Sequence, residues 1–255
     1  MPDGGGPALL SRSVNLVLFE SAAAAVRLAP GDPRAAHIRE VLGLQTGGAL
    51  FVGVVNGPLG KAVVAEDGPD GLKLDIVWEK EIARPRPLYV LVGRPRPQTA
   101  RDVLREGATF GLAALHFFGA EKGEPSYAHS TLWQSGEWER RLRDGAAQAF
   151  ATNIPEVVQH ENLADCIQNL DTLAPAGAVR LALDVYEAGA PLSVLAPADG
   201  PVVLALGAER GWSPAERTQL RAAGFALAHL GTRVLRVETA LVAGLSVLLA
   251  RRGEF

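Results

Sequence analysis

Two loops near the carboxyl terminus combine glycine with charged residues in a pattern suited to ligand binding. GAERGW (207–212) follows the apolar run VVLAL (202–206), and GTRVLRVETA (231–240) follows the apolar run FALAHL (225–230). In a parallel sheet, ligands sit at the carboxyl ends of the strands, and glycine lets the backbone approach a flat ligand closely. Each loop alone also fits a plain turn that leads into a helix, so both interpretations stay open at this point.

Other common chemistries lack the residues that they need. The histidines never fall in HExxH or a similar metal-binding spacing, and the single cysteine excludes a cysteine-ligated zinc site. The sequence also contains no G-x-S-x-G elbow, no P-loop and no G-x-G-x-x-G fingerprint. We therefore expect no metal. By their spacing, the histidines and the cysteine are interpreted as packing or surface residues: His37, His116, His129, His160, His229 and Cys166.

Length and charge limit the architecture. A chain of 255 residues that is 48% hydrophobic can form two domains, and its net charge of −3 argues against a protein that coats nucleic acid through bulk electrostatics. Arginines are nevertheless concentrated between residues 84 and 105, where Asp102 is the single acid. This stretch predicts either a local positive face or a solvated helix face with a proline-rich linker. Its arginines are Arg84, Arg86, Arg94, Arg96, Arg101 and Arg105.

Several features predict a cytoplasmic protein. One cysteine fits a reducing compartment, no apolar run is long enough to span a membrane, and the Gly-rich start lacks the order of a secretory signal. We expect residues 1–13 to form a disordered tail.

The first organised block, over residues 14–80, predicts a small β-barrel. Its short β-like runs are separated by Gly, Pro, Asn and Asp turn signals. A short helix is expected over 37–47, where apolar residues recur at helical spacing and glycine ends the segment. The expected strands cover 15–19, 49–55, 61–66 and 72–78.

Prolines at 85 and 87 mark a boundary, after which strands and helices alternate over residues 86–255. The strands are apolar throughout, which is typical of a mostly parallel sheet covered on both faces by helices. SPAE (213–216) has the signature of a capped helix start. The expected strands are 88–92, 112–118, 178–183, 202–206 and 225–230, and the expected helices are 99–107, 136–151, 163–170, one from 213, and 238–250.

The order and spacing of the two loops closely resemble the C-terminal block of the 16S rRNA uridine-N3 methyltransferase family, which belongs to the SPOUT class. Members of that family read roughly IGPEGGFS-x-x-E and then LGxRILRxETA. More faintly, 37–50 resembles the family's H-x-x-x-VLR segment, and 148–155 resembles its Q-x-x-R-x-x-x-P segment. The matching positions are Leu206, Gly207, Glu209, Gly211, Trp212, Ser213 and Glu216, then Leu230, Gly231, Arg233, Val234, Leu235, Arg236, Glu238, Thr239 and Ala240.

The resemblance implies a PUA-like, RNA-binding β-barrel over 14–80 and a SPOUT α/β domain over 86–255 whose C-terminal segment is threaded into a trefoil knot. In this family S-adenosyl-L-methionine (SAM) lies bent in the knotted loops, and the proteins are homodimers. The implied cofactor-binding residues are Leu183, Leu206, Gly207, Ala208, Glu209, Gly211, Leu230, Gly231, Val234, Leu235 and Ala240.

The implied reaction is methyl transfer from SAM to N3 of a uridine in 16S ribosomal RNA, so the implied partner is ribosomal RNA or the small ribosomal subunit. Uridine N3 carries a weakly acidic proton, and the site must favour the anion by a base or a nearby cation. Arg236 and Glu238 are the candidates, and an ion pair between them that holds the loop is the structural alternative. The residues expected to bind RNA are His37, Arg39 and Arg233, together with Arg94, Arg96 and Arg101 of the arginine-rich stretch, which could replace arginines that relatives carry elsewhere.

The chain departs from the family pattern at a few positions. GPEGG reads GAERG here, with Ala208 and Arg210, and Ala151, Asn153 and Asn15 lie near places where relatives carry arginine. Two alternatives therefore stay open: a SAM-dependent enzyme for a different RNA, and a knotted SAM-binding protein without catalytic activity.

Overall fold

The structure is a computed structural model that describes residues 16–255. The expected tail over 1–13 lies outside the described residues, as do Val14, where the barrel was expected to begin, and Asn15. The chain forms two compact units. The N-terminal unit comprises the chain up to Ala83 together with Ala147–Thr152, and the C-terminal unit comprises Arg84–Ala146 and Asn153–Phe255.

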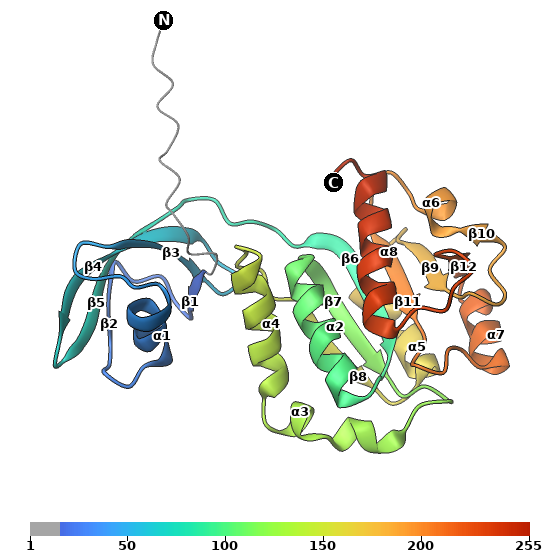
Figure 1. The fold of residues 1–255 in the computed structure, drawn as a ribbon. Coiled ribbons are helices and arrows are strands. Elements are labelled where there is room, and N and C mark those ends of the chain that lie inside the picture. Colours follow the sequence, from blue (N-terminus) through green and yellow to red (C-terminus); the bar gives the residue numbers. More distant parts are fainter. Residues whose placement is uncertain (1–15) are drawn as a thin grey trace, which may run out of the picture. The chain divides into compact units, whose positions relative to one another are not determined.

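The N-terminal unit contains a curled, mixed five-stranded sheet (Figure 1). Its order is β1-β3-β4-β5-β2, with β1 parallel to β3 and the other neighbours antiparallel. The predicted barrel is thus a curled sheet in which β1 and β2 are the two edges. Alternate residues of β5, such as Leu72, Leu74 and Ile76, point into the core. The strands are β1 (Val17–Phe19), β2 (Ala25–Leu28), β3 (Ala49–Val54), β4 (Leu59–Gly68) and β5 (Gly71–Trp78).

The helical segment of this unit differs from the one predicted over 37–47. Helix α1 (Pro33–Ala36) begins earlier, because the Asp32 carboxylate accepts the Arg34 N–H at 2.8 Å and proline occupies the first helical position. It continues as a π-helical turn, η1 (His37–Val41). The sequence pattern also missed strand β2, in which Leu28 is the only buried residue.

The C-terminal unit contains a seven-stranded sheet in which every neighbouring pair is parallel, which confirms the predicted sheet. Its order is β10-β12-β9-β11-β6-β7-β8. The predicted bounds of β7 and β11 are confirmed, whereas the sequence analysis gave no bounds for β8 and β10. The strands are β6 (Arg86–Gly93), β7 (Leu112–Phe118), β8 (Glu156–His160), β9 (Val179–Leu183), β10 (Ala190–Pro191), β11 (Val202–Leu206) and β12 (Ala226–His229).

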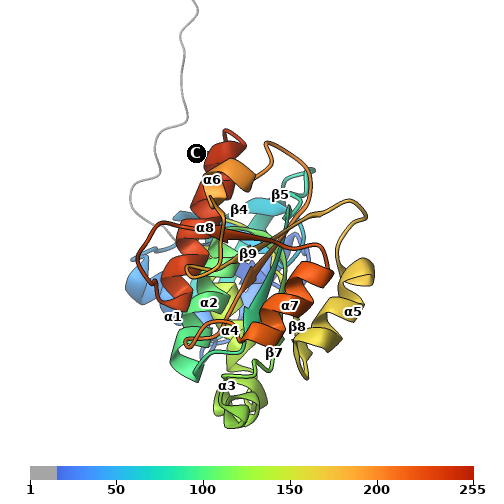
Figure 2. The same cartoon turned by 90° about the vertical axis from the view of Figure 1, so that its right-hand side faces the viewer.

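Helices cover both faces of this sheet (Figures 1 and 2). The predicted helices are confirmed with small shifts at their ends, and η2, α3 and α6 are additional short ones. None of the helices in the described part of the chain has the length and hydropathy needed to span a membrane. The helices are α2 (Pro97–Thr109), η2 (Pro125–His129), α3 (Thr131–Gln134), α4 (Glu137–Gln148), α5 (Leu163–Leu173), α6 (Leu192–Leu195), α7 (Pro214–Ala222) and α8 (Val237–Arg251).

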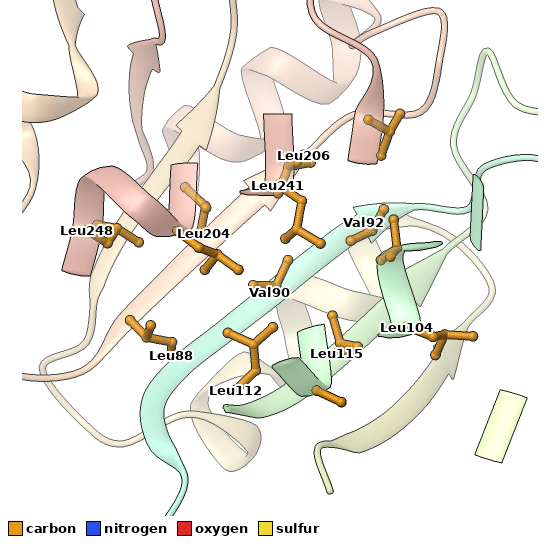
Figure 3. Packing of buried hydrophobic residues seen from close by; sticks show 14 of the residues in the cluster. Leu88, Val90, Val92, Leu104, Leu112, Leu115, Leu204, Leu206, Leu241 and Leu248 are labelled. Carbon is orange, nitrogen blue, oxygen red and sulfur yellow. The ribbon is translucent and has the colours of Figure 1, made fainter. Parts of the chain in front are cut away.

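Two hydrophobic cores lie on opposite faces of the sheet because successive strand residues point to opposite sides. Leu88, Val90 and Val92 of β6 pack with residues of α2 and α8 (Figure 3), whereas Leu91 packs with residues of α5 and α7. Cys166 is fully buried in the second core, and burial raises the pKa of its thiol to about 12. It is therefore a packing residue, as predicted, and the continuous apolar runs are explained by strands that are buried on both faces.

Candidate active site

Three loops meet at the carboxyl ends of β9, β11 and β12, which are neighbouring strands of the sheet. Together they enclose a cavity of about 220 Å³. Gly207 from the loop after β11 and Gly231 from the loop after β12 both line it. The two glycine-bearing loops singled out in the sequence therefore face one shared space, which favours ligand binding over two independent chain reversals.

All residues that the resemblance implied for the cofactor line this cavity: Leu183, Leu206, Gly207, Ala208, Glu209, Gly211, Leu230, Gly231, Val234, Leu235 and Ala240. Most of them are apolar, as is typical of small-molecule sites. Their role in binding stays a prediction, while their convergence is a property of the fold.

The loop after β11 is tightly folded. Gly211 has φ +64°, and a Cβ added to Gly207 would lie 3.1 Å from the carbonyl carbon of Gly211. A Cβ at Gly93, the last residue of β6, would lie 2.6 Å from the backbone nitrogen of Ala208. The Glu209 carboxylate also accepts a hydrogen bond of 2.8 Å from the backbone N–H of Arg96. The loop is thus held against the end of β6 without room for larger residues at Gly93 or Gly207.

Trp212 and the start of α7 anchor the same loop. The indole N–H of Trp212 donates to the carbonyl of Leu183 at 2.8 Å, and its ring stacks on Phe118 with centroids 5.9 Å apart. The predicted capping box is confirmed, since Ser213 and Glu216 exchange hydrogen bonds of 2.8 and 3.0 Å. The Trp212 hydrogen bond thus ties the loop after β11 to the end of β9, and the capping box fixes the start of α7 directly after that loop.

The loop after β9 and helix α7 carry two charged residues that the sequence analysis did not identify. Asp184 and Arg217 are both buried and form an ion pair of 2.5 Å. Burial alone would raise the pKa of Asp184, but hydrogen bonds from Arg217 and from the N–H groups of Glu187 and Tyr186 hold that pKa below its ordinary value. The available signal was its position directly after an expected strand, at the edge where ligands bind.

Arg236 and Glu238 lie at the start of α8. Arg236 is its exposed N-cap residue, and Glu238 is half-buried in the first turn. They flank Val237, which lines the cavity, but neither side chain belongs to the cavity wall. No ion pair joins Arg236 to Glu238 in the part of the chain that the structure describes, so the structural alternative for these two residues is wrong.

The arginines between 84 and 105 do not form a free positive face. Arg86 pairs with Glu254 at 2.7 Å, Arg101 with Glu137 at 2.7 Å, and Arg105 with Asp102 at 3.0 Å. Hydrogen bonds from Arg101 and Arg141 lower the pKa of Glu137 to about 2. The sequence-based expectation of a local positive face is wrong for these three arginines, because Asp102 of the same stretch and two acids from later in the chain, Glu137 and Glu254, pair with them.

The other residues implied for RNA binding belong partly to the N-terminal and partly to the C-terminal unit. Arg94 donates to the Gln159 side chain at 2.8 Å, and burial lowers its pKa. Arg39 pairs with Asp67 at 2.5 Å, and His37 is half-buried in η1. The Arg96 side chain is exposed and donates to Thr99 at 3.2 Å. Of the implied RNA-binding residues, Arg233 alone is exposed and also lines the cavity.

Two histidines form a buried pair away from the cavity loops. Nδ1 of His116 lies 3.2 Å from Nε2 of His160, and burial lowers the pKa of His116 to about 4. Across residues 16–255, no group of three or more His, Cys, Asp or Glu side chains is arranged to hold a metal ion. Both histidines therefore serve packing at neutral pH.

Comparison with known proteins places this arrangement in a family. The sequence model of the RNA methyltransferase domain matches residues 83–249. The chain is 33% identical to a ribosomal RNA small subunit methyltransferase E of Treponema pallidum, over 93% of this chain and 91% of that protein. It is 25% identical to the protein of the same name from Mycobacterium tuberculosis, over 88% and 86% of the two chains.

Solved structures show the same fold. The structure of a ribosomal RNA small subunit methyltransferase E from Neisseria gonorrhoeae bound to S-adenosyl methionine matches with a TM-score of 0.76, at 17% identity, over 92% of this chain and 97% of that one. A structure of a Legionella pneumophila protein in complex with SAM also matches with a TM-score of 0.76, at 22% identity, over 94% of this chain and 98% of that one. From the family match and the similarity along nearly its whole length, the chain belongs to the RNA methyltransferase family that includes the ribosomal RNA small subunit methyltransferases E.

Proposed function

We propose that this protein is a SAM-dependent methyltransferase that modifies N3 of a uridine in 16S ribosomal RNA. Family membership supports RNA methylation, and the name of the Treponema relative supports a substrate in the small ribosomal subunit. The observation that carries the proposal is the single cavity lined by the loops after β9, β11 and β12. A site at the carboxyl ends of parallel strands is where this kind of fold binds its ligands.

The residues of the cavity fit SAM. Leu206, Leu230 and Val237 offer apolar walls to an adenosine group, and the tight turn at Gly207 keeps side chains out of the space. Glu209 adds a carboxylate to the cavity wall, where a negative charge offsets that of a sulfonium. When bound, SAM supplies an electrophilic methyl group to an acceptor nitrogen.

In this proposal Arg236 and Glu238 act on the acceptor. A uridine attacks through the lone pair of N3, so the proton on N3 must leave and the resulting charge on O2 and O4 must be stabilised. In the proposed mechanism the guanidinium of Arg236 stabilises that charge, and the carboxylate of Glu238 accepts the proton. Their positions on either side of Val237 support this assignment, as does the lack of an ion pair between them among the described residues.

Contacts to the RNA backbone are assigned to the exposed cations of the cavity. Arg210 and Arg233 both line it, and neither guanidinium has a hydrogen-bond or ion-pair partner in the described part of the chain. Unpaired guanidinium groups at the entrance to a site bind phosphate well. In this proposal Arg210, which replaces a glycine of the family pattern, belongs to the RNA-binding surface together with Arg233.

We also propose a homodimer in which a second copy covers the exposed apolar edge of the cavity. Val234 is 67% exposed and Leu235 is 36% exposed, although both are apolar and line the cavity. Apolar surface of this kind is stabilised when a partner covers it. Light scattering on the purified protein tests this part, and a monomer at micromolar concentration would contradict it.

The main experiment measures methyl transfer from labelled SAM. The substrates are small ribosomal subunits and naked 16S rRNA from a strain that lacks the corresponding methyltransferase. We expect label in 16S rRNA, recovered as 3-methyluridine after digestion and mass spectrometry. Label confined to another RNA would reject the proposed substrate, and SAM binding without transfer to any cellular RNA would reject the enzymatic function.

A further inference from the structure

Tyr186 combines high exposure with a fixed position. It lies in the loop after β9 and lines the cavity, yet the residue is 73% exposed. Its hydroxyl has no hydrogen-bond partner among the described residues. Large aromatic side chains usually bury most of their surface in a folded protein, and a ring left open beside a cavity offers a flat face to a ligand.

The loop that carries Tyr186 is clamped to helix α7 by ion pairs on both sides of the residue. Asp184 pairs with Arg217 at 2.5 Å, and Glu187 pairs with Arg221 at 2.6 Å. The carboxylate of Asp184 also accepts the backbone N–H of Tyr186 at 2.6 Å. The backbone of Tyr186 is therefore held from both ends, and its side chain projects from a preorganised support.

The ring itself rests on a buried cation. The guanidinium carbon of Arg217 lies 5.9 Å from the centroid of the Tyr186 ring, within the range of a cation–π contact. Arg217 is 7% exposed and cannot swing away, because Asp184 holds it. One face of the ring is thus supported by Arg217, which leaves the opposite face for a second flat group.

We infer that Tyr186 is a platform on which the target base of the RNA stacks when it enters the site. This inference rests on the proposed function and adds a residue that recognises the substrate. The π-face of a tyrosine binds nucleobases by stacking. The cavity is lined in part by buried aliphatic residues such as Leu206, whereas Tyr186 is exposed to solvent, where a large RNA can reach it. Arg210 and Arg233, which line the same cavity, are available for the phosphates that flank the base.

The test combines a change in the protein with a change in the RNA. Tyr186→Ala removes the ring and Tyr186→Phe keeps it, while Val194→Ala alters another exposed residue, 68% exposed on α6 and outside the cavity wall. The RNA probe is a 16S rRNA fragment with either uridine or an abasic residue at the position that the wild type methylates. Affinities are measured by filter binding, kinetics by label transfer, and SAM affinity by calorimetry.

We expect Tyr186→Ala to raise KM for the RNA about tenfold with little change in kcat, and Tyr186→Phe and Val194→Ala to match the wild type. Removal of the base should weaken RNA binding about tenfold in the wild type and hardly at all in Tyr186→Ala. This loss of sensitivity to the base is a result that a merely structural role of Tyr186 would not produce.

Two results would overturn the inference while leaving the proposed function intact. One is an equal effect of the abasic residue on the wild type and on Tyr186→Ala. The other is a loss of SAM affinity in Tyr186→Ala, because it would place the ring against the cofactor instead of the base. Absence of methyl transfer by the wild-type protein would overturn the proposed function and this inference together.

Discussion

Two groups of arginines in the C-terminal unit differ in whether an acidic side chain pairs with them. In the first group, Arg86, Arg101 and Arg105 are neutralised by acidic side chains at distances of 2.7 to 3.0 Å. In the second group, Arg233 and Arg236 lie at the loop after β12 and have no side-chain partner in the described part of the chain. The number of arginines in a segment therefore says little about nucleic-acid binding. An arginine is available for nucleic-acid binding only where the fold places no acidic side chain beside it.

The difference has a local cause. Arginines of the first group lie on β6 and α2, and acids from α2, α4 and the C-terminal segment lie within reach of them. The second group lies on a loop that ends at the exposed N-cap of α8, and neither arginine of this group has an ion pair with Glu238 in the part of the chain that the structure describes. Arg217 is a third case, a buried arginine whose partner Asp184 is also buried. Each case predicts a different response to substitution.

The largest effect is expected for the buried pair. Asp184→Ala leaves Arg217 charged and without its partner, which should lower the free energy of unfolding by about 3 kcal/mol. Urea unfolding measures this loss. The control is Asp102→Ala, which breaks a pair whose side chains are still 31% and 38% exposed, and it should cost less than about 1 kcal/mol. Equal losses in the two variants would remove the distinction between buried and exposed pairs.

Arg236→Ala should give the next largest effect, on the rate rather than on stability. Loss of a cation that stabilises the charge on uridine should lower kcat roughly 100-fold. The midpoint of thermal unfolding should stay unchanged, because the side chain is exposed and makes no contact that holds the fold. Arg140→Ala, which removes an exposed arginine of α4, is the matched control. Unchanged turnover in Arg236→Ala would remove this residue from the mechanism.

Arg233→Ala should act mainly on RNA affinity. A single lost phosphate contact weakens binding and lowers the slope of log affinity against log salt by about 0.7 for single-stranded RNA. Filter binding over a range of salt concentrations measures this slope. If the slope stays at the wild-type value, Arg233 does not contact phosphate, and the contrast between the two arginine groups would lose its functional meaning.

Arg101→Gln should have the smallest effect on function. It should leave RNA affinity unchanged, since the Arg101 guanidinium is already paired with Glu137. The pKa of Glu137 is lowered to about 2 from 4.5, so the pair contributes stability above pH 4.5 and loses it as the pH falls through about 2. The difference in thermal midpoint between wild type and variant should therefore stay constant from about pH 8 to about pH 5. A clear loss of RNA affinity in this variant would return Arg101 to the RNA-binding surface.

Much of the C-terminal unit could be predicted from the sequence because its signals are local. Buried parallel strands such as Leu112–Phe118 and Val202–Leu206 are continuous apolar runs. The start of α7 is marked by the capping residues Ser213 and Glu216, which are close together in the sequence. Trp133 and Trp138 are partly buried, and both pack against the first core.

The parts that sequence reasoning missed depend on contacts between distant residues. Asp184 acquires its role from Arg217, and Tyr186 acquires its support from the same residue on α7. Arg101 pairs with Glu137 and is therefore not free for RNA. The start of α1 depends on Asp32, which lies outside the apolar pattern over 37–47 that predicted the helix. No periodicity encodes such pairings, so they become visible only when the chain is folded.

Trp212 gives the protein a built-in optical reporter. Its indole is 2% exposed, lines the cavity, and is held by the carbonyl of Leu183 and by the ring of Phe118. Trp78, Trp133 and Trp138 do not line this cavity and would contribute a constant background. Changes in tryptophan emission during a titration should therefore follow the filling of the cavity directly, without a label and before any chemistry occurs.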